Sequence, residues 1–390
     1  MTEQYEDPAD GFFEAPSPAP TDRKEQRPGG SDSETERIPL AHIKVRVSTD
    51  STPDDDVVLD RPEPKGAHRL RKGMVLNRNV LENPLGGGKS VDVWQASHPE
   101  HGPTLVKVVG EISYPSVDVK RLDPGAFATM EKTFLEFETF HQLVIDTLAP
   151  QAPGDGALLK LLEMGRTEEG RIFKVARFLS HEILSAGGRL SKRSKDALEP
   201  APSIGKVKAN RWDPEQKMRL VRSVLLSLWQ LHKHDIVHGD IKPNNILAVN
   251  TPTGYVARLI DYDNCFLSGN PFDATLIGGD ETYFSPERAA YQEGDLEDIS
   301  RLTTASDLFS LSLVLHQVLS EGASLPRWSI KRGSAEESCS AGGTPTYMPL
   351  GTGNSQLEEM LKACLRLDSD SRPSTYSLLV ASGVYLERKA

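Results

Sequence analysis

The chain has 390 residues, of which 37% are hydrophobic, and a formal net charge of −11 at pH 7. This excess of acidic residues argues against a general nucleic-acid binder, because phosphate backbones attract lysine and arginine. Its three cysteines lie far apart without metal-ligand spacing, so we expect no disulfide framework and a reducing cytoplasm as the natural location.

Two apolar runs, Val221–Leu231 and Leu308–Leu319, are the longest in the chain. Both are too short to cross a membrane, and polar residues interrupt both. The first ten residues are acidic and lack an apolar core, so no signal peptide is expected. We therefore expect a cytoplasmic protein that does not bind membranes.

Residues 1–68 differ in composition from the rest of the chain. They are rich in Pro, Glu, Asp, Ser and Thr and carry few large apolar side chains. Such a segment cannot bury enough apolar surface to offset the entropy lost on ordering, so we expect a disordered tail. Within it, the alternation in Ile38–Val47 could form a strand on binding a partner.

From residue 69 onward the apolar pattern becomes regular. Strand-like pieces surround a glycine cluster between Asn77 and Val109. Residues 127–148 carry apolar side chains at helical spacing, and two strand-like runs follow at Ala157–Met164 and Arg171–Leu179. A proline near its start marks Pro214–His234 as an amphipathic helix.

The C-terminal third is mainly helical in pattern, with one loop-rich segment at Glu321–Gly353. The sequence therefore predicts a small strand-rich part followed by a larger helical part. A cleft between two such parts is a common place for a ligand.

The segment His238–Leu247, HGDIKPNNIL, carries the strongest chemical signal. It resembles the catalytic loop of the eukaryotic-like serine/threonine protein kinases, H-x-D-x-K-P-x-N. Phosphoryl transfer needs positioning, charge stabilisation and one group that receives the proton of the attacking hydroxyl. The resemblance implies that Asp240 receives this proton, that Lys242 neutralises the moving phosphoryl group and that Asn245 binds Mg²⁺. His238 is expected to be a packed residue that shapes the loop.

A second match lies sixteen residues after Asn245, where the sequence is Asp261-Tyr262-Asp263. It occupies the position of the kinase metal motif D-F-G, so Asp261 is expected to bind Mg²⁺ or Mn²⁺. Asp263 replaces a glycine that the family uses for backbone freedom. We interpret Asp263 as a surface acid that tolerates the turn, and a second metal ligand is the alternative.

The nucleotide side is predicted upstream, in Leu85–Trp94 (LGGGKSVDVW). Aligned to the kinase pattern G-x-G-x-x-G-x-V, Gly86, Gly88 and Val93 match. A tight turn alone would explain the glycines equally well. Lys107, downstream in LVKVV, strengthens the match, because it corresponds to the lysine that contacts the α- and β-phosphates of ATP.

A lysine on a buried strand needs a partner for its charge. We expect that partner to be Glu136 in the following helix, because Phe140 and Leu143 at i+4 and i+7 resemble a buried face. Glu138 is the alternative. The long gap between lysine and glutamate suggests that Asp118–Gly125 is an inserted loop.

Three further positions match the family. Ser-Pro-Glu at 285–287 resembles A-P-E, and Glu287 is expected to pair with Arg372. Asp307 resembles the aspartate that opens a central helix and braces the catalytic loop. Ala176 falls at the gatekeeper position of the adenine pocket.

The sequence also departs from the family. Gly239 stands where many of these kinases have arginine, and Asp280 stands where threonine is usual. Asp280 could repel Asp240 or pair with Lys242. The stretch 185–211 is an insertion-like segment with seven lysines and arginines, which could bind an acidic partner or be a solvated loop.

The resemblance implies an α+β fold with two lobes, about 69–179 and 180–390, and an ATP-dependent protein kinase that acts on serine and threonine of protein substrates and on itself. A pseudokinase or nucleotide-binding scaffold that recruits partners is the alternative, and a small-molecule kinase is a third. The presence of Lys107, Asp240, Asn245 and Asp261 disfavours a pseudokinase.

Overall fold

The computed structural model describes residues 70–87, 92–148, 161–179, 201–251, 254–295 and 299–384. The tail 1–68, Gly88 and residues 185–200 of the basic stretch lie outside these ranges, so what the sequence predicts for them stays a prediction. No helix within the described ranges is long and apolar enough to cross a membrane.

The first part of the described chain forms a six-stranded antiparallel sheet in the order β1-β2-β3-β4-β6-β5. The strands are β1 (Val75–Leu76), β2 (Asn79–Gly87), β3 (Asp92–His98), β4 (Gly102–Ser113), β5 (Leu161–Arg166) and β6 (Arg171–Arg177). Trp94, Val106 and Val175 fill one core of this sheet. The strand predictions for this region are confirmed where the structure describes it, residues 157–160 of one predicted strand lying outside, and Gly86 and Gly87 of the glycine cluster end β2.

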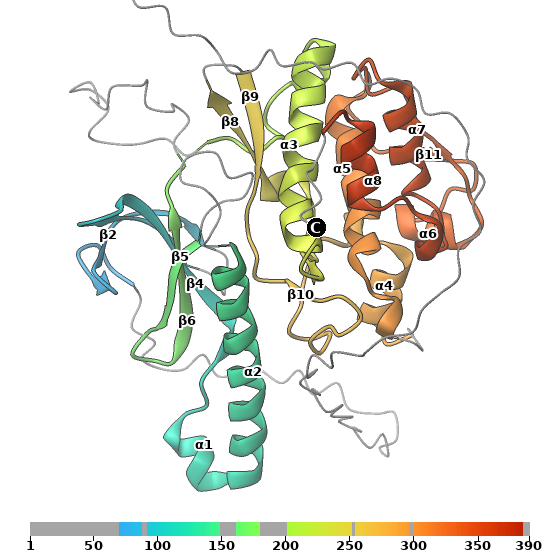
Figure 1. Ribbon diagram of the computed structural model, residues 1–390. Helices are drawn as coiled ribbons and strands as arrows, with labels where there is room; N and C mark the ends of the chain where they lie inside the picture. The colour runs from blue at the N-terminus through green and yellow to red at the C-terminus, as the bar shows by residue number, and fades with distance from the viewer. Residues whose placement is uncertain are drawn as a thin grey trace, which may run out of the picture. The chain divides into compact units, whose positions relative to one another are not determined.

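Helix α2 (Pro124–Leu148) covers the sheet beside β4 and β6, as Figure 1 shows. Phe134 and Phe137 of the helix share a buried cluster with Val109 and Ile172 of these strands. The predicted helix over 127–148 is confirmed and begins three residues earlier.

The segment before α2 corrects one expectation. Asp118–Gly125 is not an inserted loop, because most of it belongs to the short helix α1 (Val117–Leu122) and the start of α2. The Ser116 side chain accepts the N–H of Val119 and so caps α1. The Asp123 side chain accepts the N–H of Ala126 and starts α2 in the same way.

The second part of the chain is mainly helical, with short strand pairs (Figure 1). The helices are α3 (Pro214–His232), α4 (Pro286–Glu293), α5 (Thr304–Leu319), α6 (Ala335–Ser340), α7 (Ser355–Ala363) and α8 (Thr375–Ala381). The strands are β7 (Ile236–Val237), β8 (Ile246–Thr251), β9 (Gly254–Leu259), β10 (Phe266–Leu267), β11 (Arg327–Trp328) and β12 (Pro345–Thr346). Single 3₁₀ turns are η1 (Ala209–Arg211), η2 (Pro243–Asn245), η3 (Glu281–Tyr283), η4 (Ile299–Arg301) and η5 (Ser369–Ser371).

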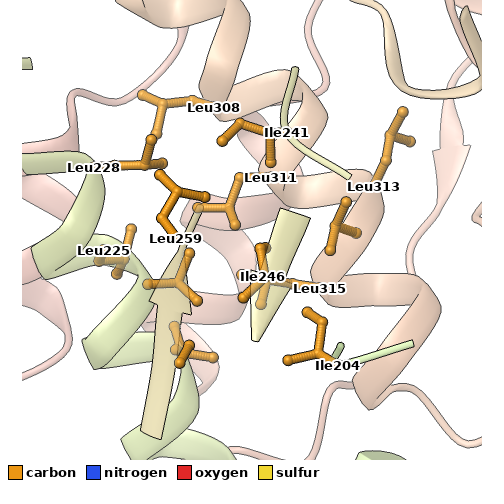
Figure 2. Close-up of a cluster of buried hydrophobic side chains, with 14 of the residues drawn as sticks. Ile204, Leu225, Leu228, Ile241, Ile246, Leu259, Leu308, Leu311, Leu313 and Leu315 are labelled. Atoms are coloured by element: carbon orange, nitrogen blue, oxygen red, sulfur yellow. The ribbon is translucent and has the colours of Figure 1, made fainter. Parts of the chain in front are cut away.

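The central helices of this part enclose a core of aliphatic side chains, shown in Figure 2. Leu228 of α3, Leu259 of β9 and Leu311 of α5 are fully buried there. Ile241 and Ile246, which lie within the catalytic-loop motif on either side of 242–245, point into the same cluster. Burying each such side chain stabilises the fold by about 1.5–3 kcal/mol, so both ends of the loop are anchored in the core.

The predicted pair of Glu287 and Arg372 is present and buried. The two guanidinium nitrogens donate to the two carboxylate oxygens at 2.6 and 2.9 Å. The guanidinium also lies over the ring of Phe309, 5.1 Å from its centroid. This bidentate pair ties the start of α4 to the segment before α8.

We predict that Glu287→Ala lowers the free energy of unfolding by about 3–5 kcal/mol, because it leaves a buried guanidinium without its counter-charge. Glu359→Ala is the matched control, since Glu359 forms an exposed pair with Lys362 at 4.0 Å. That control should cost less than about 1 kcal/mol. Urea unfolding of both variants tests this, and equal losses would contradict it.

Candidate active site

Two side chains of the catalytic-loop motif donate to the carboxylate of a third. Asp240 is 5% exposed and follows β7. Its Oδ2 accepts from Lys242 Nζ at 2.7 Å and from Asn245 Nδ2 at 2.8 Å. The structure therefore brings together the three residues that the sequence singled out.

Asp307, in the first turn of α5, holds this loop in place. Its carboxylate accepts the backbone N–H of His238 at 2.7 Å and of Gly239 at 3.0 Å. Burial opposes ionisation of Asp307, but hydrogen bonds from His232 and His238 outweigh it and lower its pKa. The expected bracing role is confirmed, and His238 is fully buried as expected.

Asp261 and Asn245 offer the atoms that a hard cation prefers. The Asn245 amide nitrogen donates to two oxygens of Asp240, which leaves its amide oxygen for a ligand. Mg²⁺ binds carboxylate and amide oxygens and takes its remaining ligands from water and substrate phosphates. This donor set fits Mg²⁺. The described residues contain no group of three or more His, Cys, Asp or Glu that could hold a metal ion by themselves.

The predicted nucleotide residues lie in one row across the sheet. Gly86 of β2 pairs with Val93 of β3, which pairs with Lys107 of β4, which pairs with Lys174 of β6. Directly paired residues share a face of the sheet. Ala176 is two residues beyond Lys174, hence on the same face, and is buried opposite Leu105.

The prediction that Glu136 is the partner of Lys107 is wrong. The Glu136 side chain is 38% exposed and pairs with Lys132 of its own helix, at 3.8 Å. The alternative, Glu138, binds Arg166. The reason is the rotation of α2: Leu143, expected on the buried face with Glu136, is 48% exposed.

Lys107 instead binds the segment after β9. Its Nζ lies 2.5 Å from Asp261 Oδ1 and 2.6 Å from Asp263 Oδ2. Burial opposes the charge on Lys107, but the two carboxylates outweigh it and raise its pKa.

The interpretation of Asp263 as a surface acid is also wrong. Asp263 is 6% exposed, and its second oxygen lies 2.6 Å from Lys174 Nζ. Burial opposes ionisation, but Lys174 and Lys107 outweigh it and hold the pKa of Asp263 well below its usual range. Both oxygens of Asp263 therefore accept from lysines. Neither oxygen is free to bind a metal ion, as the alternative interpretation would require.

Sequence reasoning missed two members of this cluster, Lys174 and His141. Lys174 Nζ lies 3.1 Å from Nδ1 of His141, which is the α2 residue that reaches the site. Burial and the charge of Lys174 lower the pKa of His141 well below its usual value, so the imidazole is neutral. A signal was available, because Lys174 interrupts an apolar strand as Lys107 does.

The departures at Gly239 and Asp280 have local explanations. Gly239 has φ +77°, and a Cβ there would lie 2.4 Å from the carbonyl oxygen of Asn264, so an arginine does not fit. Asp280 does not pair with Lys242. Its carboxylate accepts the backbone N–H of Thr282 at 3.1 Å, and its own backbone N–H donates to Asp240 Oδ1 at 3.3 Å.

We predict that Gly239→Ala destabilises the protein much more than Gly294→Ala. Both glycines have φ near +80°, but a Cβ at Gly294 meets nothing within 4 Å. The control should therefore show only the left-handed backbone cost of about 1–2 kcal/mol, and Gly239→Ala should add the clash with Asn264. Thermal unfolding of both variants measures the difference, and equal midpoints would contradict it.

Comparison with known proteins adds a family assignment for part of the chain. Residues 196–382 match the family model described as a protein kinase domain. A calcium/calmodulin-dependent serine/threonine-protein kinase of Malus domestica is 27% identical over 176 residues, 44% of this chain and 40% of the relative. Serine/threonine-protein kinase 17A of Oryctolagus cuniculus is 29% identical over 183 residues, 47% of this chain and 39% of the relative. The chain thus spans less than half the length of these relatives.

Among solved structures, the kinase domain of Mycobacterium tuberculosis PknI is similar with a TM-score of 0.49 and 15% sequence identity. The match covers 80% of this chain and 98% of that one.

Proposed function

Because this chain belongs to the eukaryotic-like serine/threonine protein kinase family, we propose that it transfers the γ-phosphoryl group of ATP to serine and threonine hydroxyls of proteins, itself included. The observation that carries the proposal is the convergence of Lys242 and Asn245 on the buried carboxylate of Asp240. This is the arrangement that phosphoryl transfer requires of a base, a cation and a metal ligand.

Each group has a proposed role. Asp240 receives the hydroxyl proton as the new O–P bond forms and the bond to the β-phosphate oxygen breaks. Lys242 neutralises charge on the moving phosphoryl group. Mg²⁺ or Mn²⁺, when held by Asn245 and Asp261, offsets the phosphate charge.

The sheet supplies the remaining nucleotide contacts. Lys107 binds the α- and β-phosphates, and Gly86, near the end of β2, contacts them together with Gly88. Val93 and Ala176 line the adenine end. The register that puts Gly86, Val93 and Lys107 in one row supports these roles.

One observation favours the second candidate, a pseudokinase or scaffold. Lys107 has no partner on α2 and instead binds Asp261, the proposed metal ligand. An enzyme must free this oxygen of Asp261 or bind the metal through the other oxygen, whereas a scaffold needs neither. Complete retention of the other catalytic groups supports the enzyme.

We further propose a cytoplasmic location and an acidic partner for the basic stretch 185–211. Its described part supports a contact surface, because Lys206, Lys208 and Arg211 are exposed.

We predict that Asp240→Asn lowers the phosphorylation rate by about 10²–10⁴-fold, since it removes a positioned general base, while affinity for Mg²⁺-ATP stays near that of the parent. Asp235→Asn is the matched control, because Asp235 is exposed and lies five residues upstream. Labelled ATP with purified parent, variant and control separates the candidates. A parent that binds nucleotide but transfers no phosphate would support the scaffold, and an Asp240→Asn variant at the parent's rate would reject the assigned base.

The small side chain of Ala176 generates a separate prediction. ATP analogues with a bulky N6 substituent should bind to the parent, because alanine places only a methyl group at the proposed gatekeeper position. Ala176→Met should exclude these analogues and still bind ATP. Competition binding with ATP and with the analogue tests this placement of Ala176. If Ala176→Met binds the analogue as well as the parent does, Ala176 does not line the adenine pocket.

A further inference from the structure

The cluster of two lysines around Asp263 has a function beyond charge balance. We infer that Asp263 positions Lys107 for contact with the nucleotide, the role that the sequence analysis assigned to Glu136. Lys174 in turn fixes Asp263 in place. This inference rests on the proposed function, because it concerns how Lys107 meets the phosphates of ATP.

The geometry assigns one oxygen of Asp263 to each lysine. Oδ2 accepts from Lys107 at 2.6 Å and Oδ1 accepts from Lys174 at 2.6 Å. Lys107 and Lys174 are direct cross-strand neighbours on β4 and β6, so one carboxylate can bridge both ammonium groups. A carboxylate held at two points cannot rotate away from Lys107.

The environment makes this bridge persistent. The side chains of Lys174 and Asp263 are 5% and 8% exposed, so water does not compete well for either charge. His141 closes the far side of Lys174 as a neutral ring. No helix movement is needed to complete the pair, because the anchoring carboxylate does not come from α2.

The charges also suit a polyphosphate. Lys107 and Lys174 carry two positive charges against the two negative charges of Asp261 and Asp263. If Asp261 held a metal ion in place of Lys107, Asp263 would be the one counter-charge that the described part of the chain leaves to the two lysines. One uncompensated positive charge would then be left at Lys107, where the phosphates are expected.

Calorimetric titration with Mg²⁺ and a non-hydrolysable ATP analogue tests the inference without measuring catalysis. We expect Asp263→Asn to weaken binding by about tenfold or more, since it removes a charged hydrogen-bond acceptor of Lys107. Glu136→Ala and the exposed control Asp118→Asn should bind like the parent. Parent-like binding by Asp263→Asn, or a comparable loss in Glu136→Ala, would overturn the inference.

A double variant separates positioning from stability. Asp263→Asn leaves Lys174 buried without a counter-charge, so its thermal midpoint should fall. Asp263→Asn with Lys174→Met removes that buried charge and should regain stability but not nucleotide affinity. Recovery of both would show a structural role only and would overturn the inference.

Failure of the proposed function has a different signature. A parent that binds no Mg²⁺-nucleotide contradicts the kinase proposal and the inference together. A parent that binds, with an Asp263→Asn variant that binds equally well, contradicts the inference alone.

Discussion

The carboxylate of Asp263, buried between the ammonium groups of Lys107 and Lys174, is the interaction on which the nucleotide side of the site depends. Removing one member of such a buried cluster is expected to cost about 3–5 kcal/mol, because the remaining charge stays away from water. The cluster joins β4 and β6 of the sheet to the segment that follows β9. It therefore fixes Lys107 relative to Asp261, the residue proposed to bind the metal.

A second buried carboxylate, that of Asp307, orders the loop that carries Asp240. Asp307 accepts two consecutive backbone N–H groups of the catalytic loop, and Ile241 and Ile246 anchor the loop in the aliphatic core. Asp240 is thus held by the backbone of its loop as well as by its own hydrogen bonds with Lys242 and Asn245. In both places a buried anion orders flexible groups, which is the preorganisation that electrostatic catalysis needs.

The sequence predicted the parts of this molecule that local pattern determines. The strands, the helix at Pro214 and the motif around Asp240 follow from periodicity, capping residues and spacing. The partner of Lys107 could not be predicted, because it depends on the rotation of α2. That rotation is set by the packing of Phe134 and Phe137 against Val109 and Ile172, a tertiary contact that leaves Glu136 paired with Lys132 of its own helix. The role of Lys174 could have been predicted from the sequence, since a lysine in an apolar strand needs a counter-charge.

A crystal structure of the protein with Mg²⁺ and a non-hydrolysable ATP analogue would test directly whether Asp263 bridges Lys107 and Lys174 when nucleotide is bound. We expect Asp263 to keep its contacts with both lysines, Asp261 to bind the metal, and Glu136 to stay apart from Lys107. A complex in which Lys107 pairs with Glu136 while Asp263 is exposed or binds the metal would contradict this expectation.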